Sequence, residues 1–335
     1  EECDLIEELA RIYGYQNINE KNEIQETTLF NTMKRATRIN HINNVMVSRG
    51  YSEVINYSFI SPSMNIMMGA NSKTIDIKNP LSIEMSVMRT SLLPGLLQNL
   101  MYNLQRQHEN IKLFESAKIF THNDKTNREK DVIAGICYGS KTKEQWGLES
   151  NPIDYYDVKG DLEMLFSDLG IHDQVTYSKD SHPMLCPGKN AKIDLDGITV
   201  GHVGELSPEL IMELDLVQTP ILFEIDKNHL KLPNQMHYQD HPYFPSSRRD
   251  ISLLIPENQE TLAILKTIQQ LEIPILKNVI IFDVYKGKNI ESGLISVALG
   301  LIFQAKSRTL TDEEIDRYMS NIKRQIVSNF ELKIR

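Results

Sequence analysis

The last 90 or so residues carry the pattern that most restricts the fold of this 335-residue chain, because strand-like and helix-like segments alternate there in a fixed order. Alternating apolar runs at 250–256, 278–286 and 294–304 predict strands, and the spacing at 260–271 and 312–330 predicts helices. Residues 332–334 supply a final strand. The order is β-α-β-β-α-β, the split β-α-β plan, in which both helices cover one face of a sheet and leave the other face open.

Strand alternation predicts which side chains of this sheet face the helices. The predicted core face holds Ile251, Leu253, Ile255, Ile280, Phe282, Val284, Val297, Leu299, Leu301 and Phe303. The predicted open face holds Asp250, Ser252, Asp283, Tyr285, Ser296, Ala298, Gly300 and Gln304. Small and polar residues around one tyrosine suit a surface that RNA bases approach closely. Tyr285 is then available to stack, and Arg248, Arg249 and Arg308 at the rim are available to phosphates. A plain solvated sheet face is the alternative that these residues leave open.

The same segment differs in charge from the rest of the chain. Residues 243–335 carry 7 Lys and 6 Arg against 11 acidic residues, a net charge of +2, whereas the whole chain carries −9. Nucleic-acid binding depends on clustered Lys and Arg, so a charge of +2 permits RNA binding without predicting it. Charge alone therefore does not predict RNA binding, and the residues of the open sheet face are the stronger indication.

The preceding residues predict a mixed α/β domain. Helical spacing at 5–13 ends at Gly14, a second amphipathic helix is predicted over 32–49, and residues 53–60 alternate like a strand. Further strands are predicted at 111–120, 131–139, 191–205 and 221–226, with a hairpin turn at Asp196-Gly197 and helices from Pro94 and over 157–169. We divide the chain into the end of a preceding helical domain (1–20), a core domain (21–232), a proline-rich linker (233–242) and the C-terminal domain (243–335).

Several classes of protein are excluded by what the sequence lacks. No run reaches the roughly 18 uncharged apolar residues of a membrane-spanning helix, so we expect no membrane partner. The three cysteines, Cys3, Cys137 and Cys186, lie far apart, which argues against disulfides and predicts a reducing, cytoplasmic location. The chain opens on Glu1 without a methionine or an apolar leader, and we interpret it as a piece of a longer protein.

Three motifs in the C-terminal segment occur in the order and spacing of a known domain. Phe244-Pro245-Ser246-Ser247-Arg248-Arg249-Asp250, then Phe282-Asp283-Val284-Tyr285-Lys286-Gly287, then Arg308-Thr309-Leu310-Thr311-Asp312-Glu313-Glu314 resemble the ferredoxin-fold anticodon-binding domain that ends the β subunit of bacterial phenylalanyl-tRNA synthetase. Residues 4–15 resemble the end of the helical domain before that family's core, and 79–82, 88–96 and 113–115 resemble the core itself. The resemblance implies an α+β fold, with a class II synthetase-like mixed or antiparallel sheet core followed by a ferredoxin-like βαββαβ domain.

The resemblance also implies a function. By family, this chain is a non-catalytic β subunit piece of phenylalanine-tRNA ligase. It would scaffold the catalytic α subunit in an α2β2 tetramer and bind the anticodon stem-loop of phenylalanine tRNA. The residues assigned to tRNA binding are Arg248, Arg249, Ser252, Asp283, Tyr285, Ser296, Ala298, Gln304 and Arg308. ATP is expected on the complex rather than on this chain.

Parts of the family pattern are absent or altered. The family's N-terminal tRNA-binding module and editing domain would precede Glu1, so we expect no editing by this piece. Two motifs in the core depart from the family's usual residues. Cys186-Pro187-Gly188-Lys189-Asn190-Ala191 replaces His-Pro-Gly-Arg-Ser-Ala, and Ala117 replaces a glycine.

Enzymatic chemistry on this chain itself is not predicted. Amino-acid activation needs an arginine on the α-phosphate and acidic ligands for Mg²⁺. Only three residues separate the helix ending near Gln107 from the strand at Ile111, with no arginine and no room for the required loop. No P-loop, GxGxxG or GxSxG motif is present. A free-standing RNA-binding or scaffold protein derived from the synthetase is the alternative function, and an autonomous ATP-using ligase is a third.

Asp4, Glu7 and Glu8 form the single metal candidate. Their spacing of three and four places the carboxylates on one helix face, where a cation would relieve their repulsion. Acidic residues near a helix N-terminus are also favoured by the helix dipole without a metal, and that alternative stays open. The resemblance implies a Mg²⁺ site at these positions whose first ligand lies upstream of Glu1. We therefore expect a partial site.

Overall fold

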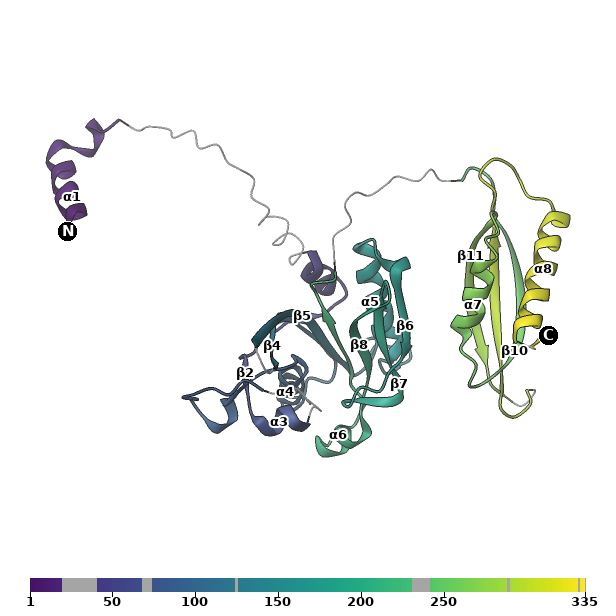
Figure 1. Cartoon of the computed structure of the whole chain (residues 1–335), viewed down its shortest axis with the longest axis horizontal. Coiled ribbons are helices and arrows are strands. Elements are labelled where there is room, and N and C mark those ends of the chain that lie inside the picture. The colour runs from purple at the N-terminus through teal and green to yellow at the C-terminus, as the bar shows by residue number, and fades with distance from the viewer. Residues whose placement is uncertain are drawn as a thin grey trace. The chain divides into compact units, whose positions relative to one another are not determined.

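The computed structural model describes residues 1–19, 41–67, 74–123, 126–230, 242–287, 290–330 and 332–334. The chain divides into two compact units, Glu1–Met236 and His237–Arg335 (Figure 1). Of the predicted linker, 233–242, residues 233–241 lie outside the described residues. Among the helices of the described segments, none combines the length and apolar character that crossing a membrane requires.

The first unit begins with the helix predicted from the sequence. Helix α1 (Glu2–Tyr13) ends at Gly14, whose φ of 87° lies in the left-handed region that glycine adopts most easily, and the short 3-10 turn η1 (Tyr15–Asn17) follows. No residue of α1 is buried, and its apolar side chains, such as Leu5, are exposed. Of the predicted helix over 32–49, the described residues 41–48 are helical and residues 32–40 lie outside the description.

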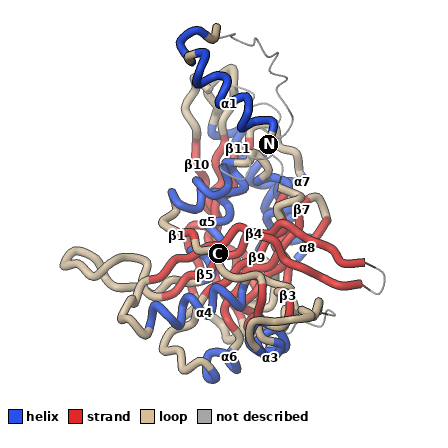
Figure 2. Tube along the Cα trace, turned by 90° about the vertical axis from the view of Figure 1, so that its left-hand side faces the viewer, coloured by secondary structure: helices blue, strands red, loops and turns tan. Residues whose placement is uncertain are grey.

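A mixed seven-stranded sheet forms the centre of the first unit. Its strands are β1 (Ser52–Glu53), β4 (Ile111–Asn123), β5 (Thr126–Tyr138), β6 (Val175–Lys179), β7 (Leu185–Leu195), β8 (Ile198–Leu206) and β9 (Ile221–Asp226), in the order β1-β4-β5-β9-β8-β7-β6. Only the β1–β4 pair is parallel among these described strands. Figure 2 shows the strands in red and the helices around them in blue. The predicted strands from 111 onward and the hairpin at Asp196-Gly197 are confirmed.

Helices cover both faces of this sheet. The remaining elements are α3 (Pro62–Met67), η2 (Ile83–Met85), α4 (Leu93–Leu104), α5 (Tyr155–Asp168), η3 (His172–Gln174) and α6 (Pro208–Glu213). One buried apolar cluster joins α5 and the helical residues 41–48 to one set of strand side chains, and a second joins α4 and α6 to the alternate set. Burial of apolar side chains on both faces is the main force that fixes this arrangement.

The predicted continuous strand over 53–60 is wrong. The chain forms only β1 and a separate two-residue strand, β2 (Phe59–Ile60), which pairs with β3 (Val87–Met88). Between them, Asn56 turns toward Glu115, whose carboxylate accepts hydrogen bonds from the Asn56 backbone N–H at 3.3 Å and side-chain Nδ2 at 2.8 Å. Because this backbone donor is used by a side chain, the segment does not extend the strand ladder.

The second unit has the predicted β-α-β-β-α-β order. Its elements are β10 (Ser247–Pro256), α7 (Thr261–Gln270), β11 (Leu276–Tyr285), β12 (Leu294–Phe303), α8 (Asp312–Phe330) and β13 (Lys333–Ile334), and the sheet order is β11-β12-β10-β13. The paired strands are all antiparallel. Apolar side chains of α7 and α8 pack with Leu253, Val297 and Leu301, which are at most 1% exposed. The predicted fold class is therefore confirmed for this unit.

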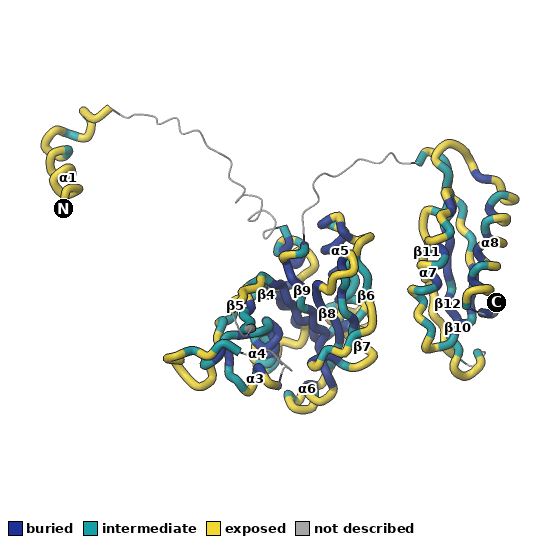
Figure 3. Tube along the Cα trace, in the orientation of Figure 1, coloured by how far each residue is buried: buried dark blue, intermediate teal, exposed yellow. Residues whose placement is uncertain are grey.

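Strand β11 departs from the prediction. Ile280, Phe282 and Val284 were expected in the core, but they are 38%, 48% and 58% exposed, and the strand is largely exposed along its length (Figure 3). A shift of register between Ile281 and Asp283 marks a β-bulge. A bulge inserts one residue, so the alternation of faces reverses across it. Ile280 therefore lies on the open face opposite a glycine of β12, whereas Val284 stays on the helix side of an uncovered edge.

The start of α8 follows the predicted cap only in part. The Thr311 hydroxyl accepts a hydrogen bond from the Glu314 backbone N–H at 3.4 Å, and Leu310 and Ile315 are both buried. The Glu314 carboxylate, which would complete a capping box, instead accepts two hydrogen bonds from Arg308. The cap is therefore one-sided.

Candidate nucleic-acid interface

The sheet of the second unit has an open face, opposite α7 and α8, built by three of its strands. Directly opposed residues of antiparallel strands point to the same face, and the register therefore sorts the side chains. The open face holds Arg248, Asp250, Ser252 and Leu254 of β10, Ser296, Ala298, Gly300 and Ile302 of β12, and Ile280, Asp283 and Tyr285 of β11. Phe282 joins them, because its ring lies beneath Arg248. The predicted placement of Asp250, Ser252, Asp283, Tyr285, Ser296, Ala298 and Gly300 on this face is confirmed.

Arg248 crosses the open face rather than standing at its rim. Its guanidinium carbon lies 4.6 Å from the centre of the Phe282 ring, and its Nε donates to the Asp250 carboxylate at 2.7 Å. Gly300 makes this path possible, because a Cβ at that position would come within 2.9 Å of the Arg248 Nε. The Arg248 side chain remains 48% exposed. The open face therefore presents a guanidinium held between a carboxylate and an aromatic ring.

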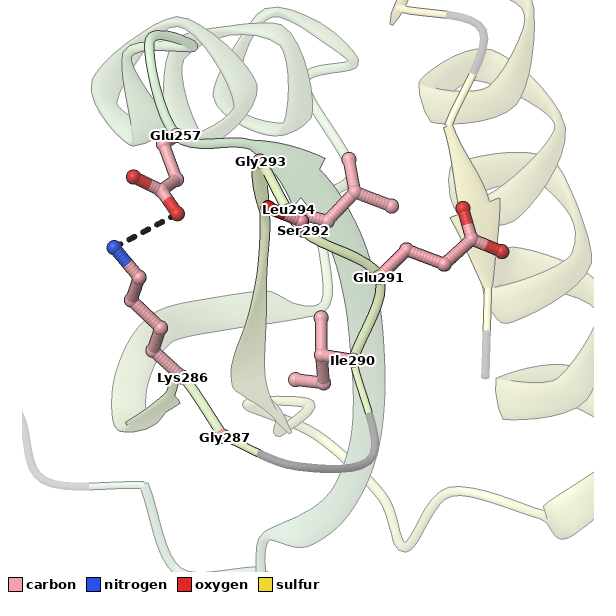
Figure 4. A pocket seen from close by; sticks show the side chains of 8 residues that line it. All are labelled: Glu257, Lys286, Gly287, Ile290, Glu291, Ser292, Gly293 and Leu294. Carbon is pink, nitrogen blue, oxygen red and sulfur yellow. Dashed lines mark ion pairs between the residues drawn. The ribbon is translucent and has the colours of Figure 1, made fainter.

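Tyr285 ends β11 and is 45% exposed. Gly287 lies under its hydroxyl, since a Cβ there would come within 2.2 Å of the Tyr285 Oη. Beyond the tyrosine, Lys286 pairs with Glu257 at 2.8 Å on the rim of a hollow of about 530 Å³, as Figure 4 shows. Tyr285 therefore offers a ring next to a lysine whose charge is already partly offset.

Three further predicted residues have polar partners within the protein. The Ser252 and Ser296 hydroxyls lie 2.9 Å apart, and Ser296 is only 9% exposed. Gln304 donates to the Phe244 carbonyl at 2.7 Å and accepts from Lys277 at 3.0 Å. Ser296 and Gln304 thus shape the surface and its border, and Ala298 leaves the centre of the face low.

The two other predicted arginines do not join the open face. Arg249 points to the helix side, where it pairs with Asp312 and, at 3.9 Å, with Asp316 of α8. Arg308 donates to both carboxylate oxygens of Glu314 at 2.7 Å. These hydrogen bonds raise the pKa of the Arg308 guanidinium and lower the pKa of the Glu314 carboxyl. The expectation that all three arginines line one rim is therefore wrong, because carboxylates of α8 draw two of them away.

Comparison with known proteins gives two domain matches. Residues 24–227 match the family model described as phenylalanyl tRNA synthetase beta chain CLM domain, and residues 242–335 match the model described as ferredoxin-fold anticodon binding domain. This chain belongs to the phenylalanyl-tRNA synthetase β chain family. The resemblance drawn from the sequence motifs is therefore confirmed.

Family members resemble the chain over its full length. Proteins named phenylalanine-tRNA ligase beta subunit are 35% identical in Nitrosospira multiformis, 34% in Yersinia pestis and 35% in Coxiella burnetii, each aligning with 100% of this chain. The chain spans 42% of the length of each of these relatives. A solved pyrrolysyl-tRNA synthetase from Desulfitobacterium hafniense aligns over 58% of this chain and 65% of its own, at 12% identity and a TM-score of 0.46, a similarity too distant to bear on function.

The magnesium site that the family resemblance implies is not matched by the contacts seen here. The Glu8 carboxylate accepts two hydrogen bonds from the Arg11 side chain. Across the described segments, no group of three or more His, Cys, Asp or Glu side chains gathers closely enough to hold a metal ion. Asp4, Glu7 and Glu8 therefore do not fit a metal centre as they stand, and the partial Mg²⁺ site stays a prediction.

The altered family motif at 186–191 lies on β7. Lys189, in the position of the family's usual arginine, pairs with Glu205 of β8 at 2.8 Å. That hydrogen-bonded carboxylate raises the pKa of the Lys189 ammonium. Lys189 therefore keeps a positive charge at this position and fastens it to the neighbouring strand.

Sequence reasoning missed Phe282 and Ile280 as residues of the open face. A strand covered on one side alternates, but Val279, Ile280, Ile281 and Phe282 form an unbroken apolar run. Such a run indicates apolar side chains on both faces or an irregular strand. That signal is present in the sequence, although it does not reveal where the bulge falls.

Proposed function

We propose that this chain is the non-catalytic C-terminal part of a phenylalanine-tRNA ligase β subunit, and that residues 243–335 bind the anticodon stem-loop of phenylalanine tRNA. One observation carries the proposal. The segment that matches an anticodon-binding domain has a helix-free sheet face with two exposed rings, one exposed guanidinium and small residues between them. Aromatic rings and arginine planes are the groups on which unpaired RNA bases stack.

The other assignments belong to the same proposal. Residues 1–20 form the end of a helical domain, residues 21–232 form a scaffold for the catalytic α subunit in a cytoplasmic α2β2 tetramer, and residues 233–242 link the two described units. Of the nine predicted tRNA-binding residues, the proposal gives Arg248 and Tyr285 the direct stacking contacts. It keeps Ser252, Asp283, Ser296, Ala298 and Gln304 on or beside the open face, and it assigns Arg249 and Arg308, which pair with carboxylates of α8, to contacts outside that face. ATP and the Mg²⁺ that accompanies it are assigned to the complex. By holding the tRNA in one pose, the β subunit raises the fraction of encounters that lead to reaction.

We assign the active site to the α subunit rather than to this chain. In the described core, Lys112, Lys118 and Lys130 lie on β4 and β5 and could attract a phosphate only if their charges were free. Each of them pairs with a carboxylate, namely Asp161, Glu129 and Asp226 respectively. The pairs offset the charge that a phosphate would otherwise attract.

The RNA-binding part is tested by titrating the full chain with RNA stem-loops. We expect the stem-loop with a phenylalanine anticodon to bind at low salt, to bind more tightly than stem-loops with other anticodons, and to weaken as salt rises. Equal affinity for all stem-loops, or no binding at low salt, would overturn the recognition claim.

The scaffold part is tested by co-expression with a phenylalanine-tRNA ligase α subunit. Stable co-purification of the two chains supports the β subunit assignment. If the chain binds RNA but does not co-purify with the α subunit, the free-standing RNA-binding alternative is favoured. Pyrophosphate exchange by the chain alone would revive an autonomous ligase.

A further inference from the structure

Arg248 reaches over an entire strand to find its aromatic partner. It belongs to β10, Phe282 belongs to β11, and β12 lies between these two strands in the sheet. The side chain passes over Gly300 of β12, where a Cβ would come within 2.9 to 3.1 Å of the Arg248 Nε, Nη2 and Cζ atoms. Arg248 therefore lies low over the sheet surface at this point.

The direction of the side chain is fixed at both ends of the guanidinium. Asp250 accepts a hydrogen bond from Nε at 2.7 Å, and the ring of Phe282 lies 4.6 Å beneath Cζ. A cation over an aromatic face is stabilised by the negative potential of the ring. The side chain is nevertheless 48% exposed, so the guanidinium remains open to a ligand.

We propose that Arg248, held over Phe282, is a stacking site for one unpaired base of an RNA loop, and that Arg248 acts through its plane rather than as a phosphate ligand. This inference rests on the proposed RNA binding by residues 243–335. The small residues Ala298 and Gly300 leave room for a flat ring to approach. Guanidinium planes and aromatic rings both stack on bases, and a layered pair joins these two properties in one site.

The charges near Arg248 disfavour a phosphate role. Asp250 already offsets its charge at hydrogen-bond distance, and Asp283 is a second exposed carboxylate on the same open face. A phosphate placed on Arg248 would meet repulsion from these groups, whereas the face of a neutral base meets much less. The geometry therefore favours base stacking over phosphate binding as the role of Arg248, a distinction that the sequence alone does not make.

Substitutions that separate charge from shape test the inference. In titrations of the full chain with the phenylalanine anticodon stem-loop, we expect R248K to keep the charge but lose the planar surface, and F282L to keep apolar bulk but lose the ring. Each should weaken binding about tenfold, the scale of one base stack. The double variant should lose little more than either single variant, since both remove the same stack. R324K is the matched control, because Arg324 is an exposed residue of α8 on the other side of the sheet.

Salt dependence distinguishes stacking from a phosphate contact. A phosphate contact made by Arg248 would let R248K bind almost as tightly as the wild type, and R248A would reduce the slope of log affinity against log salt by about 0.7. Stacking predicts that R248K and R248A weaken binding alike and leave that slope unchanged. G300A adds a variant that displaces the guanidinium without altering any charge, and it should weaken binding in the same way.

Abasic stem-loops locate the base. One loop position, when stripped of its base, should bring the wild type and R248K to equal affinity. If the wild type binds no stem-loop, the proposed function itself fails. If the wild type binds specifically but R248K binds equally well, or if no abasic position removes the difference, only the stacking assignment is overturned. Circular dichroism and thermal unfolding of each variant show that a loss of affinity is not a loss of folding.

Discussion

Arg89 and Glu115 form an ion pair of 2.7 Å inside the first unit, with side chains only 4% and 2% exposed. The same carboxylate accepts from the Asn56 backbone and side chain, and Arg89 Nε donates to the Lys118 carbonyl at 3.1 Å. The pair therefore fastens the segments that flank β2 and β3 to β4. A buried charge left without its partner is costly, which makes this contact a sensitive point of the core.

Replacing Glu115 with alanine is expected to lower the free energy of unfolding of the first unit by about 3–5 kcal/mol, because Arg89 is left buried and unpaired. Urea unfolding followed by circular dichroism measures the change. The exposed pair Lys118–Glu129 provides the control, since E129Q should cost less than about 1 kcal/mol. A double replacement of Arg89 and Glu115 by methionine and leucine that is more damaging than E115A would contradict this account.

Tyr51 connects two buried groups on different elements. Its hydroxyl lies 3.1 Å from the Asp161 carboxylate of α5 and accepts from the Cys137 thiol of β5 at 3.0 Å. Burial raises the pKa of Tyr51 well above its ordinary value, so the hydroxyl stays protonated and donates to Asp161. Y51F should destabilise the first unit by about 1–3 kcal/mol, because both partners lose a hydrogen bond inside the core. Chemical denaturation is the measurement, and Y57F, at an exposed tyrosine, should change little.

Because of His182, we expect the free energy of unfolding of the first unit to decrease at acid pH. Burial, and then the neighbouring His202, lower the pKa of His182 to about 4, and its Nδ1 lies 3.3 Å from the Met184 backbone N–H, which donates to the neutral ring. The unfolded chain binds this proton near pH 6.5, so the stability is complete above that pH and is lost as pH falls toward 4. The loss should reach at most about 3 kcal/mol.

Unfolding curves recorded between pH 7 and pH 4 measure this decrease in the free energy of unfolding, and H182Q should make the decrease smaller. H108Q, at an exposed histidine, provides the matched control. If the free energy of unfolding of H182Q fell with pH as steeply as that of the wild type, other titrating groups would cause the effect.

Gly135 of β5 is predicted to be intolerant of any side chain. A Cβ there would come 2.4 Å from Cε1 of Phe223, its partner on β9, and 3.1 Å from the Leu113 carbonyl of β4. G135A should therefore cost about 1–3 kcal/mol through overpacking, measured by thermal or urea unfolding. G147A, at a position with nothing within 4 Å of the added carbon, is the control. Adding F223L to G135A should recover part of the loss, and a double variant less stable than G135A would argue against a steric cause.

Regular alternation is the part of this structure that sequence predicts well. In β10 and β12 each residue keeps the face that the two-residue period assigns, and Leu253 and Leu299 are fully buried as expected. Helix α8 likewise follows its apolar stripe, with Ile315 and Ile322 buried. These elements are predictable because one buried face constrains every second or every third and fourth residue.

The candidate site was only half predictable, because its key features are not periodic. The bulge of β11 moves Phe282 to the open face, and no spacing rule marks its position. The sequence predicts that Arg249 and Arg308 face RNA, but Asp312 and Glu314 of α8 pair with them. Asn56 similarly leaves its strand for a glutamate 59 residues away. The positions of these polar side chains thus depend on carboxylate partners that lie 6, 59 or 63 residues away, and periodic patterns do not identify those partners.

The irregular β11 also bears on whether separate copies of this chain adhere to one another. Strand β11 is an edge strand of its sheet. It exposes Ile280, Ile281, Phe282 and Val284, and such an exposed apolar edge favours pairing with a strand of another chain. Two shifts of register interrupt its backbone spacing, one between Leu276 and Asn278 and one between Ile281 and Asp283. A strand from another chain that paired with β11 would find backbone donors and acceptors at uneven intervals, and it would form fewer inter-strand hydrogen bonds. The two register shifts of β11 therefore reduce the tendency of this exposed apolar edge strand to pair with another chain and aggregate.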